Sequence, residues 1–163
     1  LTMNASAAQY KWYDIDFVEG KKIRSHENIL TSTTLLLQFI EEAVAAFKLD
    51  GKNVYLLGFS QGCILSIALA INHPELIKNV IGLSGYLCEE FIDEDRTKKD
   101  FSHLDFYCSH GSSDQVIPVN WARLTSPILD SLNIKYKYSE FPVGHGVAPQ
   151  NFYELKDWLS TRI

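Results

Sequence analysis

The sequence predicts an α/β fold, a three-layer α/β/α sandwich around a mainly parallel sheet. Short apolar runs bounded by turn residues alternate with longer segments in which apolar residues recur at helical spacing. Strands separated by helices require right-handed crossovers, which make the strands parallel and cover both faces of the sheet. The chain has 163 residues and no Pro/Gly/Ser-rich linker, so we expect a single domain over residues 1–163.

The first predicted elements are a long helix and a buried strand. Apolar residues such as Leu36 and Ile40 recur at helical spacing through residues 25–48. We expect Gly51 to close this helix, because glycine tolerates the left-handed conformation of a helix end. Residues 54–57 are then an apolar run between turn residues, which is typical of a buried strand.

The middle of the chain repeats this alternation. Residues 63–72 are apolar nearly all round, as expected of a helix packed against a sheet, and Pro74 should stop this helix. Two short apolar runs, residues 80–83 and 104–108, predict the next two strands.

The last third predicts a helix, a strand and a closing helix. Residues 118–132 have a helical pattern that Pro127 should kink or divide. Residues 135–141 alternate tyrosine with lysine, which suits a strand near the edge of the sheet. Residues 151–159 place apolar side chains on one helical face. The predicted sheet therefore has four strands.

Composition excludes several classes of protein. The net charge is −5, without the basic stripe of a nucleic-acid groove, so no nucleic-acid partner is expected. The longest apolar-rich run, residues 63–71, is too short to span a bilayer, and the start shows no signal peptide, so no transmembrane segment is expected. Three cysteines without a close-spaced pattern predict free thiols, no metal site and a cytoplasmic protein.

A candidate nucleophile lies between the strand at residues 54–57 and the following helix. Residues 58–62, Gly-Phe-Ser-Gln-Gly, match the pattern G-x-S-x-G, with Ser60 on the sharp turn. Small residues are needed two positions before and after the serine, and Gly58 and Gly62 meet this need. The N–H of Gln61 would be one donor of an oxyanion hole. The alternative is that two glycines around a serine only make a tight connection.

A serine hydroxyl needs a base, and the sequence offers five histidines: His26, His73, His103, His110 and His145. We favour His145, because it follows the last strand in a loop with glycine on both sides. Asp114 follows the strand at 104–108 and would orient the imidazole, with Glu140 as the alternative acid. Asp114 would otherwise be an ordinary turn residue.

These residues together resemble the phospholipase/carboxylesterase family of α/β-hydrolases, which includes acyl-protein thioesterases. The resemblance rests on residues 58–62, on His110-Gly111 with Asp114, on Gly144-His145, and on the aromatic-acid segment Trp12-Tyr13-Asp14. It implies hydrolysis of carboxylic esters or thioesters through a seryl acyl-enzyme, with no cofactor. It carries over Ser60 as nucleophile, Asp114 as orienting acid, His145 as base and Gln61 as an oxyanion donor.

The sequence departs from the family pattern in two places. Cys63 stands where the family commonly has glycine. The family also begins with further strands and a His-Gly loop that supplies the second oxyanion donor, and nothing before Ser60 supplies this loop. We therefore expect an α/β-hydrolase fold that lacks its N-terminal strands in this chain, which starts at Leu1. Loss of one oxyanion donor costs about 10²–10³ in rate, so the alternative function is a catalytically impaired or silent binding module.

The substrate-binding residues are predicted from their positions near the strand ends. The candidates for an apolar acyl site are Trp12, Tyr13, Leu87, Val116, Ile117 and Val147, each of which would otherwise pack in the core or a loop. The expected partner is a small-molecule ester or an acylated substrate. A homodimer is left open.

Overall fold

The computed structural model describes residues 4–6, 9–18 and 21–163. The chain divides into two compact units, Leu1–Gly51 and Lys52–Ile163, and each is described by itself. The assignment of residues 1–163 to a single domain stays a prediction.

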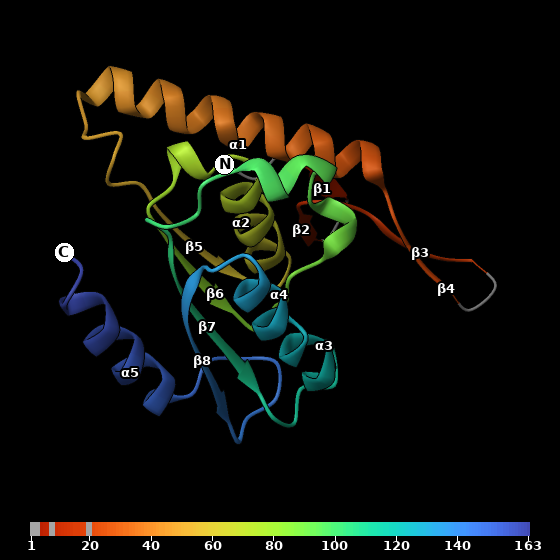
Figure 1. Cartoon of the computed structure of the whole chain (residues 1–163). Helices are drawn as coiled ribbons and strands as arrows, with labels where there is room; N and C mark the ends of the chain where they lie inside the picture. Colours follow the sequence, from red (N-terminus) through yellow and green to blue (C-terminus); the bar gives the residue numbers. More distant parts are fainter. Residues whose placement is uncertain (1–3, 7–8, 19–20) are drawn as a thin grey trace. The chain divides into compact units, whose positions relative to one another are not determined.

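Within the first unit, two short antiparallel hairpins precede a long helix (Figure 1). The strands are β1 (Asn4–Ser6), β2 (Gln9–Lys11), β3 (Ile15–Val18) and β4 (Lys21–Arg24), and the helix is α1 (His26–Phe47). Strand β1 pairs with β2, and β3 with β4. None of these four strands was predicted, because each is only three or four residues long and all but β3 are mostly polar.

Helix α1 confirms the helix predicted at residues 25–48. The Ser25 hydroxyl caps its N-terminus by accepting a hydrogen bond from the N–H of Asn28, at 3.3 Å. The predicted end at Gly51 is wrong, because Lys48 already adopts the left-handed conformation, with φ of 52°. The N–H of Lys48 bonds back to the last turn, so the helix closes without glycine.

Among the described residues, one helix is long and apolar enough to cross a membrane. It is the stretch Glu27–Phe47 of α1, with a mean hydropathy of 1.3 and 17% of its most apolar window buried. Length and hydropathy of this size also occur in the mostly buried core helices of soluble proteins and in signal sequences near an N-terminus. The prediction of no transmembrane segment was based on residues 63–71, and it stays a prediction.

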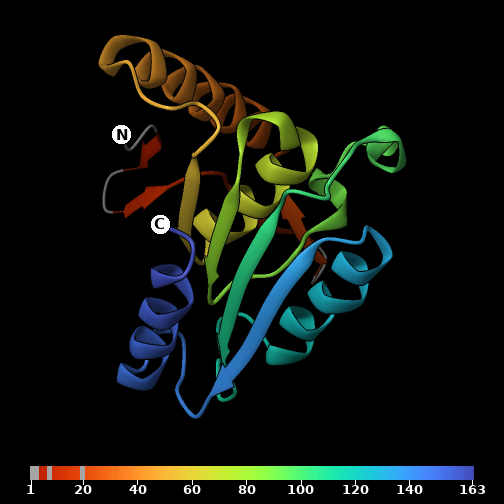
Figure 2. The ribbon, with the colours of Figure 1, turned by 60° about the vertical axis from the view of Figure 1, so that its left-hand side comes forward.

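The second unit is built on a four-stranded parallel sheet, which confirms the predicted fold class. Its strands are β5 (Tyr55–Phe59), β6 (Asn79–Leu83), β7 (Asp105–Gly111) and β8 (Lys135–Phe141). They follow one another in the order β5-β6-β7-β8, and every neighbouring pair is parallel (Figure 2). Strand β8 is at an edge, as its alternating tyrosines and lysines predicted.

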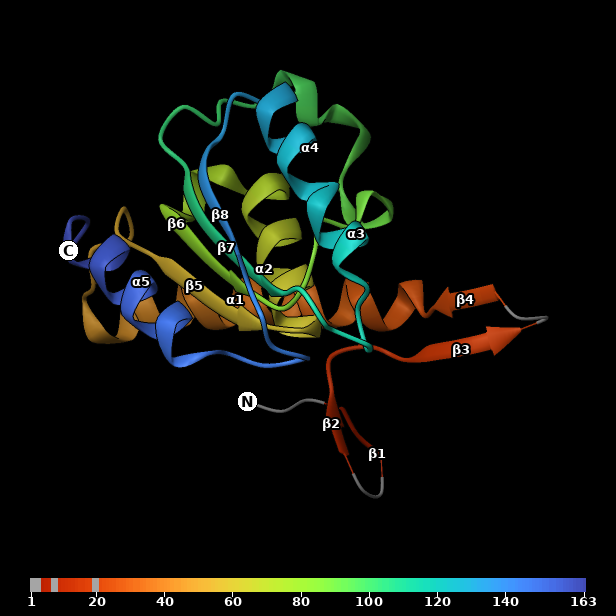
Figure 3. The same cartoon turned by 90° about the horizontal axis from the view of Figure 1, so that it is seen from below.

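Helices cover both faces of this sheet. They are α2 (Gln61–Asn72), α3 (Val119–Arg123), α4 (Thr125–Ser131) and α5 (Pro149–Ser160). Figure 3 shows α5 on one side of the strands and the other three helices on the opposite side. The division between α3 and α4 falls at Leu124, while Pro127 sits in the first turn of α4, where its missing N–H costs no helical hydrogen bond.

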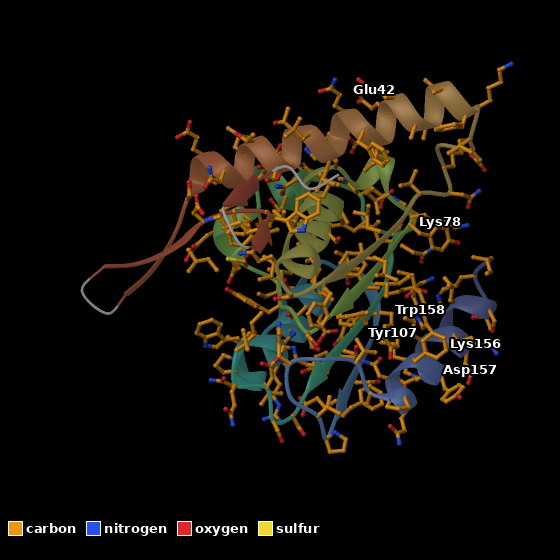
Figure 4. The ribbon with its side chains drawn as sticks, turned by 180° about the vertical axis from the view of Figure 1, so that it is seen from behind. Glu42, Lys78, Tyr107, Lys156, Asp157 and Trp158 are labelled. Atoms are coloured by element: carbon orange, nitrogen blue, oxygen red, sulfur yellow. The ribbon has the colours of Figure 1, made fainter. Side chains whose placement is uncertain are left out.

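The packing between the sheet and α5 is aromatic. Tyr107 of β7 and Trp158 of α5 are buried with ring centroids 5.7 Å apart (Figure 4). The side chains of Ile81 and Leu83 complete this cluster. The Tyr107 hydroxyl lies 2.8 Å from Oδ1 of Asn151, in the first turn of α5. This contact fixes the start of α5, and with it the end of the loop that follows β8.

Candidate active site

The candidate site lies where the parallel strands end. Ser60 follows β5 directly, Asp114 follows β7 by three positions, and His145 follows β8 by four. The carboxyl ends of parallel strands meet at one edge of a sheet, which is where ligands bind in open α/β folds. The topology thus brings together three residues that are far apart in the chain.

Ser60 sits on a strained turn. Its φ is 54° and its ψ is −118°, a conformation that side-chain-bearing residues rarely adopt. Its N–H donates to the carbonyl of Leu83 on β6 at 2.9 Å, which fixes the turn against the sheet. A Cβ at Gly58 would lie 2.2 Å from the carbonyl oxygen of Gly62, so the crossing of strand and helix requires glycine there. The turn therefore has the geometry of a nucleophile elbow.

His145 bridges the serine and the aspartate. Its Nε2 lies 3.0 Å from Oγ of Ser60, and its Nδ1 lies 2.7 Å from Oδ2 of Asp114. A carboxylate accepts hydrogen bonds, so Nδ1 carries the proton and Nε2 faces the hydroxyl as an acceptor. The ring of Phe59 lies 4.9 Å from the imidazole, centroid to centroid, and covers one side of it.

Asp114 is held by its own loop. Its Oδ1 accepts hydrogen bonds from the N–H groups of Val116 and Ile117, at 2.8 and 2.9 Å. Burial raises the pKa of this carboxyl, but the hydrogen bonds from His145, Ile117 and Val116 outweigh it and hold the pKa below its ordinary value. Asp114 is therefore a charged acceptor whose Oδ2 points at the imidazole.

The alternative acid, Glu140, has a different partner. Both of its carboxylate oxygens lie 2.7 Å from nitrogens of the Arg123 guanidinium. That pairing lowers the pKa of Glu140 and orients its carboxylate toward Arg123. Asp114 is the acid that contacts His145.

His110 is a neighbour of the site that the sequence analysis did not place. Its Nε2 lies 2.8 Å from the carbonyl of Ile117 and 3.3 Å from Oδ2 of Asp114. The predicted strand ended at residue 108, which left His110 in a loop, whereas β7 continues to Gly111. The sequence shows only a histidine four positions before the acid, and that spacing alone does not predict the contact.

The other predicted site residues occupy varied positions. Gln61 is the first residue of α2, so its N–H lies at the positive end of that helix. Leu87 and Ile117 are buried, while Val116 and Val147 are exposed. Trp12 and Tyr13 belong to the first unit, in the turn between β2 and β3. The roles of these seven residues stay predictions.

The possible metal ligands in the described part of the chain include its three cysteines. No group of three or more His, Cys, Asp or Glu residues there has the arrangement of a metal site. Cys63, Cys88 and Cys108 are all buried. Burial raises the pKa of the Cys63 thiol well above its ordinary value and that of Cys108 to about 12, so neither is a thiolate near neutral pH.

The comparisons of the sequence with known proteins all point to the same family. The model of the phospholipase/carboxylesterase family matches residues 1–163. Acyl-protein thioesterase 1 of Schizosaccharomyces pombe is 30% identical over 166 residues, which cover 100% of this chain and 73% of the relative. The probable carboxylesterase SOBER1-like of Arabidopsis thaliana is 22% identical over 166 residues. The alignment covers all of this chain but only 63% of that relative's length.

Solved structures agree on the fold. Esterase PE8 superimposes with a TM-score of 0.80 and 23% identity, covering 94% of this chain and 71% of that one. Carboxylesterase from Mesorhizobium loti gives a TM-score of 0.78 and 16% identity, covering 96% of this chain and 71% of that one. At these identities the likeness establishes the architecture and leaves the chemistry to the site.

Proposed function

Because the chain belongs to the phospholipase/carboxylesterase family of hydrolases, we propose that it is a serine hydrolase of carboxylic esters or thioesters. The observation that carries this proposal is the continuous hydrogen-bonded line from Ser60 through His145 to Asp114. Its members take the roles of nucleophile, general base and orienting acid.

Acylation begins when Nε2 of His145 takes the proton of the Ser60 hydroxyl as Oγ attacks the carbonyl carbon of the substrate. The new C–O bond turns the carbonyl oxygen into an oxyanion, and the N–H of Gln61 is proposed to donate to it. As the intermediate collapses, the bond to the leaving alcohol or thiol breaks, and His145 returns the proton to that group. The acyl group remains on Oγ as an ester.

Deacylation repeats these steps with water. His145 takes a proton from the water molecule, whose oxygen attacks the acyl carbon. The bond to Ser60 then breaks, Oγ regains the proton from His145, and a carboxylic acid leaves. Asp114 supports both acylation and deacylation, since its low pKa keeps the carboxylate charged beside the imidazolium of His145 that forms in each step.

The proposed substrate is a small ester or an acylated molecule, and the chemistry of Ser60 suits both. The names of the relatives include carboxylesterases and acyl-protein thioesterases. We also propose a cytoplasmic location, which the three buried cysteine thiols support.

The test is labelling of the intact protein with a fluorophosphonate probe, followed by peptide mass spectrometry and hydrolysis of p-nitrophenyl acetate and an acyl thioester. We expect one label, at Ser60, and turnover of at least one substrate. Ser60→Ala should abolish both the label and the turnover, while Ser112→Ala, at an exposed serine in the loop of Asp114, should preserve both. A well-folded wild-type protein with neither label nor turnover contradicts the proposal and favours a silent binding module.

A further inference from the structure

A second histidine, His110, lies against the proposed acid. The His110 side chain has no solvent-exposed surface, and its Nε2 lies 3.3 Å from Oδ2 of Asp114. The same oxygen lies 2.7 Å from Nδ1 of His145. Two imidazoles therefore converge on one carboxylate oxygen.

The neighbours of His110 settle which of its nitrogens carries a proton. Nε2 faces the carbonyl oxygen of Ile117 and the carboxylate of Asp114, and both are acceptors only. A bare lone pair at Nε2 would meet two oxygens, so Nε2 bears the hydrogen and donates it to the carbonyl of Ile117, while Oδ2 of Asp114 lies 3.3 Å away. The carboxylate accepts from His145, Val116 and Ile117, and the polar N–H of His110 lies beside it as a fourth group.

The other ring nitrogen of His110, Nδ1, does not explain why a histidine stands at this position. Among the residues that the structure describes, Nδ1 of His110 is buried without a hydrogen-bond partner. A buried polar atom without a partner destabilises the folded state, and an apolar side chain of similar size would avoid that cost. The atom of His110 that has polar neighbours is Nε2, which faces the carbonyl oxygen of Ile117 and Oδ2 of Asp114.

We propose that His110 is a positioning residue for the reaction, which holds Oδ2 of Asp114 in line with Nδ1 of His145. This inference rests on the proposed function. By donating to the carbonyl of Ile117, His110 also fixes the residue whose N–H holds Oδ1. One imidazole thus restrains both ends of the carboxylate, because Ile117 links them.

His110 also changes the electrostatic field in which His145 works. The N–H of its Nε2, 3.3 Å from Oδ2, places a partial positive charge beside the carboxylate, so the carboxylate stabilises the imidazolium of His145 less than it otherwise would. On the neighbouring strand β8, Glu140 is in register with His110 and is paired with Arg123. Removal of the His110 N–H should therefore move the acidic limb of the pH–activity profile to higher pH.

The experiment compares three variants of the intact protein. In His110→Gln the side-chain amide nitrogen reaches the place of Nε2, whereas in His110→Asn the shorter amide reaches only the place of Nδ1. The control is His103→Gln, since His103 also bonds a carbonyl through Nε2, that of Pro74 at 2.7 Å. For each variant we would measure kcat and KM against pH, the thermal midpoint, and the downfield NMR resonance of the proton between His145 and Asp114.

We expect His110→Asn to lower kcat roughly ten- to hundredfold at unchanged KM, the range for a buried acceptor, here the Ile117 carbonyl, that loses its donor. Its acidic limb should move to higher pH, and the resonance should shift or broaden. His110→Gln should retain most of kcat and the wild-type limb, and His103→Gln should match the wild type. The inference would be overturned if His110→Asn left kcat and the acidic limb of the pH profile unchanged. It would also be overturned if His110→Asn and His110→Gln lowered kcat equally. If the wild type itself has no turnover, the proposed function fails, and the resonance alone decides whether His110 holds Asp114.

Discussion

The Nε2 atom of His145 lies 3.0 Å from Oγ of Ser60, although 85 positions separate the two residues in the chain. The contact depends on backbone anchors on both sides. The Ser84 hydroxyl donates to the carbonyl of Gly146 at 3.2 Å, and the N–H of Ser113 donates to the carbonyl of Val143 at 3.0 Å. The loop that carries His145 is thus fixed to the ends of β6 and β7, beside the serine turn.

His145→Gln should lower kcat by about 10²–10⁴, because the amide cannot take the proton of Ser60. KM should change little, since the imidazole acts on Oγ rather than on substrate binding. Steady-state kinetics with p-nitrophenyl acetate measure both constants, and His73→Gln, at the end of α2, is the control. Wild-type kcat in the His145 variant would exclude it as the base.

The stability of the protein should decrease in acid through Asp114. Its pKa is lower in the folded protein than the value of about 3.9 of an unfolded chain, so its stabilisation is complete above about pH 4. The stabilisation is lost as the pH falls from there through the folded pKa. Urea unfolding at pH 7, 4 and 3 should show that Asp114→Asn is less stable than the wild type at pH 7 and that the difference narrows at pH 3. A difference that is constant with pH would contradict this assignment.

Gly111 and Gly146 make a matched pair for testing the backbone of the site. A Cβ at Gly111 would lie 2.1 Å from the carbonyl oxygen of Gly144, next to His145, whereas a Cβ at Gly146 would meet nothing within 4 Å. Gly111→Ala should displace the loop, lower kcat and cost about 1–3 kcal/mol in the free energy of unfolding. Gly146→Ala should stay within about 0.5 kcal/mol of the wild type. Equal effects of the two changes would show that the close approach at Gly111 is not maintained in solution.

Tyr107→Phe tests the contact between β7 and α5. The hydroxyl lies within hydrogen-bond distance of both Asn151 and Glu154, at 2.8 and 3.0 Å, and Asn151 is buried. Its removal should lower the free energy of unfolding by about 1–3 kcal/mol, because it leaves a buried amide oxygen short of a donor. Tyr136→Phe is the control, since the Tyr136 hydroxyl makes an exposed bond to Asp130. Urea denaturation measures the free energy of unfolding of both variants. Equal decreases in the two variants would show that the Tyr107 hydroxyl does not anchor α5 to β7.

The sheet of the second unit was predictable because its first three strands contain apolar runs next to turn residues, and the fourth alternates tyrosine with lysine. The boundary of β7 was not, since Ser109 and His110 are polar and mark the start of a loop in the sequence. Both are buried because they find polar partners from distant segments: Asn151 donates to the Ser109 hydroxyl at 2.8 Å. Such partners are invisible to a local pattern, which is why the strand seemed to end at residue 108.

The meeting of Ser60, Asp114 and His145 was predictable from topology, because each follows the end of a parallel strand. Which carboxylate contacts His145 depended on one further contact, which strand alternation alone did not decide. Arg123 binds the competing Glu140, and this pairing joins α3 to β8. The contact of His110 with Asp114 required the three-dimensional course of the turn at residues 112–117, which spacing in the sequence does not specify.

The strand order β5-β6-β7-β8 also bears on how the chain folds. Parallel strands pair only across long connections, which makes such pairing slow compared with helix formation. The loop carrying His145 can reach Ser60 only after β8 has joined β7, β7 has joined β6, and β6 has joined β5. During refolding, the site is therefore completed with the last of these pairings, so recovery of the serine–histidine contact reports the slowest step in assembling the sheet.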